Sequence, residues 1–284
     1  MMDKRYHGEY VPQWCPACGN FDLLVAVREA LAATCEPQEV ILATGIGQTG
    51  KLGFSVRANL FNGLHGRSLP LATGMAMANH GAKILVVAGD GDLYSEGGNH
   101  FIHALRRNLD VTILAGDNRV YGLTKGQGSA TSPIDFRAHL HRDGLAPQPI
   151  NPVALALVSG ATFVAKTFSA NREELTQLIK AGLAHRGVAV IDILYPCVTF
   201  NRVNTVAWYQ ERLKPIGPDH DPGDLAAAQR LANCGEEEIP TGIYYQVARP
   251  IFTDRLEALD AGPLVRRAVA WRPERVQGLF AHYR

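Results

Sequence analysis

The sequence predicts an α/β fold with a mostly parallel central sheet and helices on both faces. Short apolar runs at 39–44, 83–89, 111–116 and 188–194 are bounded by glycine, proline or polar residues. Such continuous apolar runs are typical of strands that are buried on both sides. Segments with apolar residues at helical spacing lie between the runs, and this alternation favours a parallel sheet between two helical layers.

The expected elements follow one another in this alternating order. The first is an amphipathic helix at 20–35, for which Asn20 can serve as the N-cap. A strand at 39–44 then runs into the glycine-rich turn 45–51. The next elements are a small-residue helix at 69–79, a strand at 83–89, a helix at 98–107, a strand at 111–116, a helix at 153–159, a strand at 162–168, a helix at 172–185 and a strand at 188–194.

The composition and the periodicity of the sequence change near residue 214. Several prolines and the acidic run 236–238 interrupt the periodicity, and a strand-like run at 242–247 is expected to stand alone. We therefore expect residues 1–213 to form the α/β domain, including an N-terminal C-x-x-C segment. Residues 214–284 are expected to form a C-terminal extension that wraps the domain or a partner.

The composition excludes several classes of protein. The net charge is +1 and charged residues make up 19% of the chain, so no strong field gathers nucleic acid. No apolar stretch approaches the roughly 20 residues that a membrane-spanning helix needs. The polar N-terminal segment lacks the apolar core of a secretory signal. We therefore expect a cytoplasmic protein without nucleic-acid or membrane partners.

The five cysteines include the close pair Cys15 and Cys18. This C-x-x-C spacing is typical of metal or redox sites in a reducing compartment, where structural disulfides are rare.

Polar side chains follow two consecutive strands of the predicted sheet. Asp90 lies in the turn Gly89-Asp90-Gly91 after one strand, and Asn118 follows the next. In open α/β sheets, ligands bind at the carboxyl ends of the strands. A carboxylate, an amide oxygen and the carbonyl of Val120 suit a Mg²⁺ ion that also holds phosphate oxygens. Either turn alone is more often only a turn, and it is their combination that favours a metal–diphosphate site.

These motifs resemble the thiamine-diphosphate motif of the β subunits of 2-oxoacid:ferredoxin oxidoreductases. The resemblance covers nearly the whole chain. It rests on the segments 14–19 (WCPACG), 64–70 (LHGRSLP), 89–92 (GDGD), 97–100 (GGNH), 117–124 (DNRVYGLT), 195–201 (YPCVTFN) and 239–242 (IPTG).

The resemblance implies a thiamine-diphosphate-binding fold and a set of site residues. It implies that Asp90, Asn118 and Val120 bind Mg²⁺, and that Lys51 contacts the substrate carboxylate. The general base that activates the coenzyme belongs in this family to the α subunit, so none is expected in this chain. The remaining cofactor-binding residues implied are Gln48, Thr49, His65, Gly66, Arg67, Gly89, Gly91, Asp92, Gly122, Leu123 and Thr124.

The implied reaction is oxidative decarboxylation of a 2-oxoacid, 2-oxoglutarate or pyruvate, to acyl-coenzyme A and CO₂, or its reverse. Electrons pass through an iron–sulfur cluster to ferredoxin. The α subunit of the heterodimer supplies the rest of the thiamine-diphosphate and coenzyme A sites. Two other functions stay open: a subunit of a non-redox thiamine-diphosphate-dependent decarboxylase, and a non-catalytic scaffold.

The predicted cluster site departs from the family pattern at one position. Cys15, Cys18 and Cys197 match three cluster ligands, but Gln48 stands where the fourth cysteine is expected. Cys35 lies roughly 20 Å away at the other end of a strand, and nothing local marks Cys234 as a ligand. This leaves a [4Fe–4S] cluster with a non-thiolate corner, a [3Fe–4S] cluster or a lost cluster. Zinc bound with a histidine is a further alternative for the same cysteines.

Overall fold

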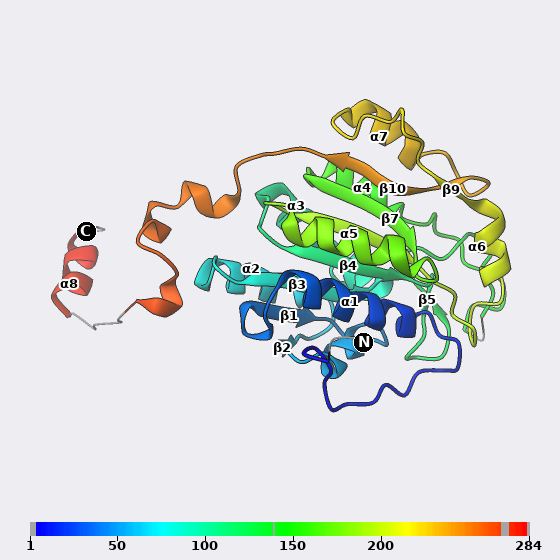
Figure 1. Ribbon diagram of the computed structural model, residues 1–284, viewed down its shortest axis with the longest axis horizontal. Coiled ribbons are helices and arrows are strands. Elements are labelled where there is room, and N and C mark those ends of the chain that lie inside the picture. Colours follow the sequence, from blue (N-terminus) through cyan, green and yellow to red (C-terminus); the bar gives the residue numbers. More distant parts are fainter. Residues whose placement is uncertain (1–3, 139, 268–272, 283–284) are drawn as a thin grey trace.

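Eight strands form one central sheet in the computed structural model, which describes residues 4–138, 140–267 and 273–282. Their order across the sheet is β2-β1-β3-β4-β8-β7-β10-β9 (Figure 1). The strands are β1 (Val40–Thr44), β2 (Asn59–Asn62), β3 (Lys83–Gly89), β4 (Thr112–Asp117), β7 (Phe163–Phe168), β8 (Ala189–Leu194), β9 (Leu213–Pro215) and β10 (Ile239–Gln246). A separate hairpin pairs β5 (Val120–Tyr121) with β6 (Gln127–Gly128).

Helices cover both faces of the sheet, which confirms the predicted fold class. On one face, α1 and α5 share a core with the sheet, and on the other face α2, α3 and α4 do so. The helices are α1 (Asn20–Thr34), α2 (Ser68–Ala78), α3 (Gly98–Arg107), α4 (Pro152–Val158), α5 (Arg172–Ala184), α6 (Val206–Arg212), α7 (Leu225–Ala232) and α8 (Pro273–His282). No helix of the described residues has the length and apolar character to cross a membrane.

The two cores explain why the central strands are apolar throughout. In β3, Ile84 and Val86 pack into the core under α2 and α3, whereas Leu85 and Val87 pack into the core under α1 and α5. Successive side chains of a strand point to opposite faces, so a strand with helices on both faces has no solvated face for polar residues.

The register of the parallel strands brings their carboxyl ends to one edge of the sheet. Thr44 of β1 pairs with Val87 of β3, and Gly89 of β3 pairs with Gly116 of β4. Asp117, the last residue of β4, pairs with Leu194 of β8. The turns that leave β1, β3, β4 and β8 therefore start side by side.

The beginning of α1 differs from the prediction. The helix begins at Asn20 itself, with Gly19 before it, and the Asn20 side chain does not cap the helix. Asn20 is instead fully buried, and neither polar atom of its side chain has a hydrogen-bond partner. The prediction that Asn20 is the N-cap is wrong, because this side chain lines a cavity beside the cysteines.

The prediction that residues 242–247 stand alone is also wrong. The strand β10 pairs antiparallel with β7, and β9 pairs parallel with β10. The main sheet thus continues past residue 213, and the division into 1–213 and 214–284 stays a prediction. After β10 the chain leaves the sheet, and α8 lies apart from it (Figure 1).

Candidate active site

A pocket lies at the carboxyl edge of the sheet, among the turns that follow β1, β3, β4 and β8. Residues from each of these turns line it together with His65. The predicted site residues that the structure brings together here are Gln48, Thr49, His65, Gly89, Asp90, Gly91, Asp92, Asn118, Val120, Gly122, Leu123 and Thr124.

Three predicted residues do not line this pocket. Lys51 lies in the 3₁₀ helix η2 (Gly50–Ser55), and its side chain forms no hydrogen bond or ion pair with the described residues. Gly66 does not line the pocket, and its N–H donates a hydrogen bond to Asp92 Oδ1 at 2.9 Å. The exposed Arg67 directs Nη1 to the carbonyls of His65 and Gly66, both at 3.4 Å.

Asp90 is buried at the base of the pocket and lies beside a second carboxylate. Its Oδ2 accepts hydrogen bonds from Ser129 Oγ at 2.5 Å and from Thr131 Oγ1 at 2.6 Å. Thr131 Oγ1 also lies 2.8 Å from Asp117 Oδ1. Burial and the nearby Asp117 carboxylate raise the pKa of Asp90, although both hydroxyls oppose the shift.

This crowding of negative charge suits a cation. A hydroxyl carries one hydrogen, so Thr131 cannot donate to Asp90 and Asp117 at the same time. Two carboxylates this close are stable together only if a proton or a metal ion offsets one charge. A magnesium ion on Asp90 would remove the conflict, since Thr131 would then be free to donate to Asp117.

Asn118 presents its amide oxygen in a fixed orientation. Its Nδ2 donates to the Tyr195 hydroxyl at 3.0 Å, and its Oδ1 accepts from the Val120 N–H at 3.0 Å. Tyr195 also hydrogen-bonds Thr49 Oγ1 at 2.8 Å. An amide oxygen has two lone pairs, so one remains for a metal ion. Asp90, Asn118 and Val120 thus offer the hard oxygen donors that Mg²⁺ prefers.

Asp92 ties the turn after β1 to the pocket. Its Oδ1 accepts from the N–H groups of Ile46 at 3.1 Å and Gly66 at 2.9 Å, whereas its Oδ2 is buried without a hydrogen-bond partner. Burial raises the pKa of Asp92 to about 6, and the two N–H groups lower it. A Cβ on Gly45 would lie 1.9 Å from Asp92 Oδ2, so only glycine fits at that position.

His65 and Glu96 complete the rim beside Asp92. His65 Nδ1 lies 2.8 Å from Glu96 Oε2. These two side chains and Asp92 bring one potential metal-binding atom each within 4.8 Å of one another. Because all three line the same pocket, they are part of this candidate site and do not form a separate one.

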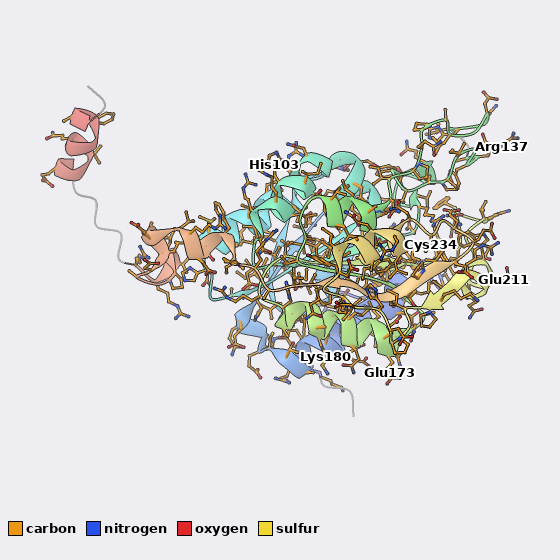
Figure 2. All side chains as sticks on the ribbon, turned by 90° about the horizontal axis from the view of Figure 1, so that it is seen from above. His103, Arg137, Glu173, Lys180, Glu211 and Cys234 are labelled. Atoms are coloured by element: carbon orange, nitrogen blue, oxygen red, sulfur yellow. The ribbon has the colours of Figure 1, made fainter. Side chains whose placement is uncertain are left out.

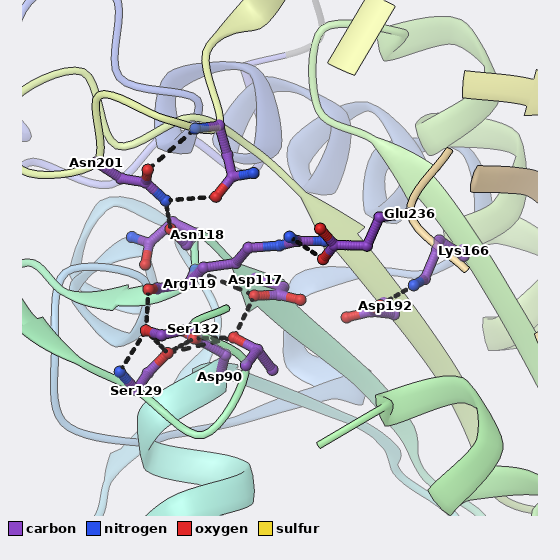
Figure 3. Close-up of polar contacts among 12 residues, drawn as sticks. Asp90, Asp117, Asn118, Arg119, Ser129, Ser132, Lys166, Asp192, Asn201 and Glu236 are labelled. Carbon is purple, nitrogen blue, oxygen red and sulfur yellow. Dashed lines mark hydrogen bonds and ion pairs between the residues drawn. The ribbon is translucent and has the colours of Figure 1, made fainter. Parts of the chain in front are cut away.

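Two charged pairs lie at another cavity, which Arg119, Lys166 and Glu236 line. Arg119 is buried and donates to Glu236 Oε1 at 2.5 Å. Lys166 Nζ forms an ion pair with the buried Asp192 at 3.1 Å (Figure 3). Burial raises the pKa of Asp192, and Lys166 opposes this shift. Each buried charge here has an opposite charge nearby, which limits the cost of removing it from water.

A second cavity adjoins the pocket and contains the predicted cluster cysteines. Cys15, Cys18 and Cys197 line it, although Cys197 lies far from the other two in the sequence. The turn between Cys15 and Cys18 closes with a 3.1 Å hydrogen bond from the Cys18 N–H to the Cys15 carbonyl. Burial raises the pKa of Cys18, and so do the nearby thiols of Cys197 and Cys15.

The two cavities share a wall. Gln48, Asn118 and Gly122 line both of them. The indole N–H of Trp14 donates to the Gln48 carbonyl at 3.1 Å and so holds the turn after β1 against the C-x-x-C segment. A Cβ on Gly122 would lie 3.9 Å from Cγ of Gln48, which places the Gln48 side chain against Gly122.

Sequence reasoning missed several residues that shape the site. Ser129 and Thr131 bind Asp90 from the loop after β6, and Tyr195 orients Asn118 from the end of β8. Tyr195 was detectable in principle, because it is a polar residue directly after a predicted strand. No spacing rule connects Ser129 or Thr131 with Asp90, since they approach it from a separate loop.

The comparisons with known protein families agree with this geometry. The model "Thiamine pyrophosphate enzyme, C-terminal TPP binding domain" matches residues 45–193. The model for the C-terminal part of the pyruvate ferredoxin oxidoreductase beta chain matches residues 197–261. The first match includes every residue that lines the pocket except Tyr195, and the second begins at Cys197.

Individual relatives point to the same family. The β subunit of 2-oxoacid:ferredoxin oxidoreductase 2 from Aeropyrum pernix is 38% identical over 264 residues, which cover 88% of this chain and 85% of the relative. The KorB subunit of a 2-oxoglutarate oxidoreductase from Mycobacterium tuberculosis is 40% identical over 199 residues, which cover 70% of this chain and 53% of the relative.

A solved structure is similar over nearly its whole length. It is the 2-oxoglutarate:ferredoxin oxidoreductase from Magnetococcus marinus with 2-oxoglutarate, coenzyme A and succinyl-CoA bound. The two chains superpose with a TM-score of 0.91 at 34% identity, over 98% of this chain and 96% of the other. The chain therefore belongs to the thiamine-diphosphate-dependent 2-oxoacid:ferredoxin oxidoreductases, as their β subunit.

Proposed function

We propose that this β subunit, together with an α subunit, converts 2-oxoglutarate and coenzyme A to succinyl-CoA and CO₂ and passes the electrons to ferredoxin. The observation that carries this proposal is the wall shared by the coenzyme pocket and the cysteine cavity, formed by Gln48, Asn118 and Gly122. Because the two cavities touch, electrons released in one have a short path into the other.

The chain's own residues hold the coenzyme end that carries the diphosphate. Asp90, Asn118 and the Val120 carbonyl would hold Mg²⁺, and Tyr195 fixes the orientation of the Asn118 amide through the hydrogen bond from Nδ2. A Cβ on Gly91 would lie 2.4 Å from the Tyr121 ring, so glycine lets that ring close over the turn. Thiamine diphosphate held there would supply the nucleophile and the electron sink that decarboxylation of a 2-oxoacid needs.

The cysteine cavity suits an iron–sulfur cluster better than zinc. Tetrahedral zinc with bonds of about 2.3 Å holds its sulfurs about 3.8 Å apart. Among the described residues, Cys15, Cys18 and Cys197 do not all bring their sulfurs within 4.8 Å of one another. No histidine or carboxylate of the described residues lines the cavity. A cluster spreads its thiolates over separate iron atoms and tolerates the wider spacing.

The substrate follows from the similar structure and from the balance of the reaction. The Magnetococcus marinus enzyme holds 2-oxoglutarate and coenzyme A, which makes this pair the first to test. A 2-oxoacid anion and coenzyme A give acyl-CoA, CO₂, one proton and two electrons, so two one-electron carriers are needed. Lys51 is proposed as the cation that binds a substrate carboxylate, since its side chain has no partner among the described residues.

The reaction requires the partner because this chain supplies one side of the coenzyme site. The name of each β-subunit relative implies an α subunit. We propose that the other end of the coenzyme is covered by the α subunit, which also supplies the carboxylate that activates it.

The test is an anaerobic assay of the complex of the two subunits. We expect reduction of a viologen dye that depends on coenzyme A and is faster with 2-oxoglutarate than with pyruvate. The Asp90→Ala variant should lose both Mg²⁺-dependent binding of thiamine diphosphate, measured by calorimetry, and dye reduction. The matched control is Asp219→Ala, at an exposed aspartate outside the site.

Each alternative function has its own signature in the same experiment. Release of free aldehyde without dye reduction identifies a non-redox decarboxylase. Absence of Mg²⁺-dependent thiamine diphosphate binding in the assembled complex identifies a scaffold.

A further inference from the structure

The cysteine cavity offers three thiols where a cubane cluster needs four protein ligands. Cys15, Cys18 and Cys197 line it, and the other two cysteines lie elsewhere. Cys35 is buried in the core beside α1, where its carbonyl accepts a hydrogen bond from the Tyr6 hydroxyl. Cys234 lies just after α7 and is exposed (Figure 2). A fourth thiolate from this chain is therefore not available at the cavity.

The wall toward the coenzyme pocket carries Gln48. The Gln48 backbone is held by the Trp14 indole, and its side chain lies against Gly122. The other polar side chains without sulfur that line the cavity are neutral as well: Gln13, Asn20, Asn118 and Thr199. None of these groups binds iron as strongly as a thiolate does.

The buried side chain of Asn20 independently indicates that the cavity holds a group. It is fully buried and lines the cavity, its weak contact with the Cys18 thiol lowers the pKa of that thiol, and neither Nδ2 nor Oδ1 has a nitrogen or oxygen partner. Buried amides in folded proteins almost always have partners, so a lone one signals a missing ion, water or ligand. Cluster sulfides and thiolates accept hydrogen bonds, and Nδ2 is a suitable donor to them.

We infer that this cavity holds a [4Fe–4S] cluster through three thiolates, and that the fourth iron faces Gln48 and is released on oxidation. The inference rests on the proposed function, which places a cluster here. A one-electron oxidant converts [4Fe–4S]²⁺ to [3Fe–4S]⁺, one Fe²⁺ and one electron, and the oxidant takes the electron. Supplying Fe²⁺ and one electron reverses the step. The iron next to the coenzyme pocket thus makes the subunit sensitive to oxidants.

The test measures iron, sulfide and paramagnetism in the anaerobically purified complex of the two subunits, before and after one equivalent of ferricyanide. The wild-type protein should lose about one of four iron atoms per β chain while its sulfide stays constant. It should also gain an EPR signal, because [3Fe–4S]⁺ has an odd electron whereas [4Fe–4S]²⁺ is diamagnetic. Fe²⁺ with a reductant should restore the lost iron.

The Gln48→Cys variant supplies a thiolate ligand for the fourth iron of the cluster. This variant should keep all its iron and stay EPR-silent. The Gln13→Cys variant adds a thiol to another wall of the same cavity and should lose iron as the wild type does. The wild-type measurements test the inference even if Gln48→Cys does not assemble.

Two outcomes overturn the inference while the proposed redox function stands. One is a wild-type cluster that keeps all its iron under ferricyanide, and the other is equal protection by Gln13→Cys. A complex that contains no sulfide contradicts the proposed cluster itself, and a complex with zinc in the cavity does the same.

Discussion

At the scale of single residues, the main feature of the site is a hydroxyl between two carboxylates. The Thr131 hydroxyl contacts both Asp90 and Asp117. It is one of two hydroxyls that hydrogen-bond Asp90 Oδ2. Partners of this kind fix the orientation of a metal ligand and contribute to the affinity of the metal. Thr131 is therefore a positioning residue for the proposed magnesium site.

Replacing Thr131 by valine keeps the shape and removes both hydrogen bonds. We expect the affinity of the complex for Mg²⁺, titrated in the presence of thiamine diphosphate, to fall roughly 10- to 100-fold. The control is Thr73→Val, where the lost hydroxyl bonds only the Leu69 carbonyl within α2. Unchanged Mg²⁺ affinity in Thr131→Val would show that Asp90 needs no such support.

Lys51 allows a separate test of substrate binding. Losing one hydrogen bond to a charged group costs about 1.5–3 kcal/mol. The Lys51→Gln variant should therefore raise the KM for the 2-oxoacid about 10- to 100-fold, with binding of thiamine diphosphate unchanged. The matched control is Lys180→Gln on α5 (Figure 2). A change in coenzyme affinity instead would assign Lys51 to the coenzyme.

At the scale of elements, the positions of the strands were predictable from the sequence, but the pairing of the strands with one another was less predictable. The central strands are apolar throughout because both faces are covered, and that pattern is local. The strand β10 was expected to stand alone because its partner β7 is distant in sequence and no local pattern encodes the pairing. The role of Asn20 was not predictable either, because the cavity that Asn20 lines forms only when the fold brings Cys197 close to the C-x-x-C segment.

The amino edge of the sheet carries a titrating side chain where α5 meets the segment before β7. His185 Nε2 lies 2.8 Å from Thr162 Oγ1, and burial lowers the pKa of His185. The unfolded chain then binds more protons than the folded protein just below about pH 6.5, so stability falls as the pH drops through that range.

The His185→Gln variant cannot take up this proton. Urea denaturation at pH 7.5 and at pH 5.5 should therefore show a smaller loss of stability on acidification than in the wild type. His103→Gln, on α3 (Figure 2), is the control. An equal acid-induced loss in wild type and His185→Gln would mean that His185 does not contribute to the pH dependence.

At the scale of the whole molecule, the fold and the general position of the site were predictable because both depend on strand ends. Twelve predicted residues meet in one pocket, since the carboxyl ends of parallel strands share an edge. The positions of Lys51, Gly66 and Arg67 relative to that pocket depend on the exact path of two turns, which residue types alone do not specify. What the α subunit adds lies outside this chain altogether.

The partition made by Gln48, Asn118 and Gly122 has a consequence for how this enzyme can change. Two turns, after β1 and after β4, border both cavities, so a substitution there that alters the surroundings of the proposed electron acceptor also alters the proposed coenzyme site. Variants selected for oxygen tolerance are therefore expected to show altered coenzyme affinity as well, because the same substitutions change both properties.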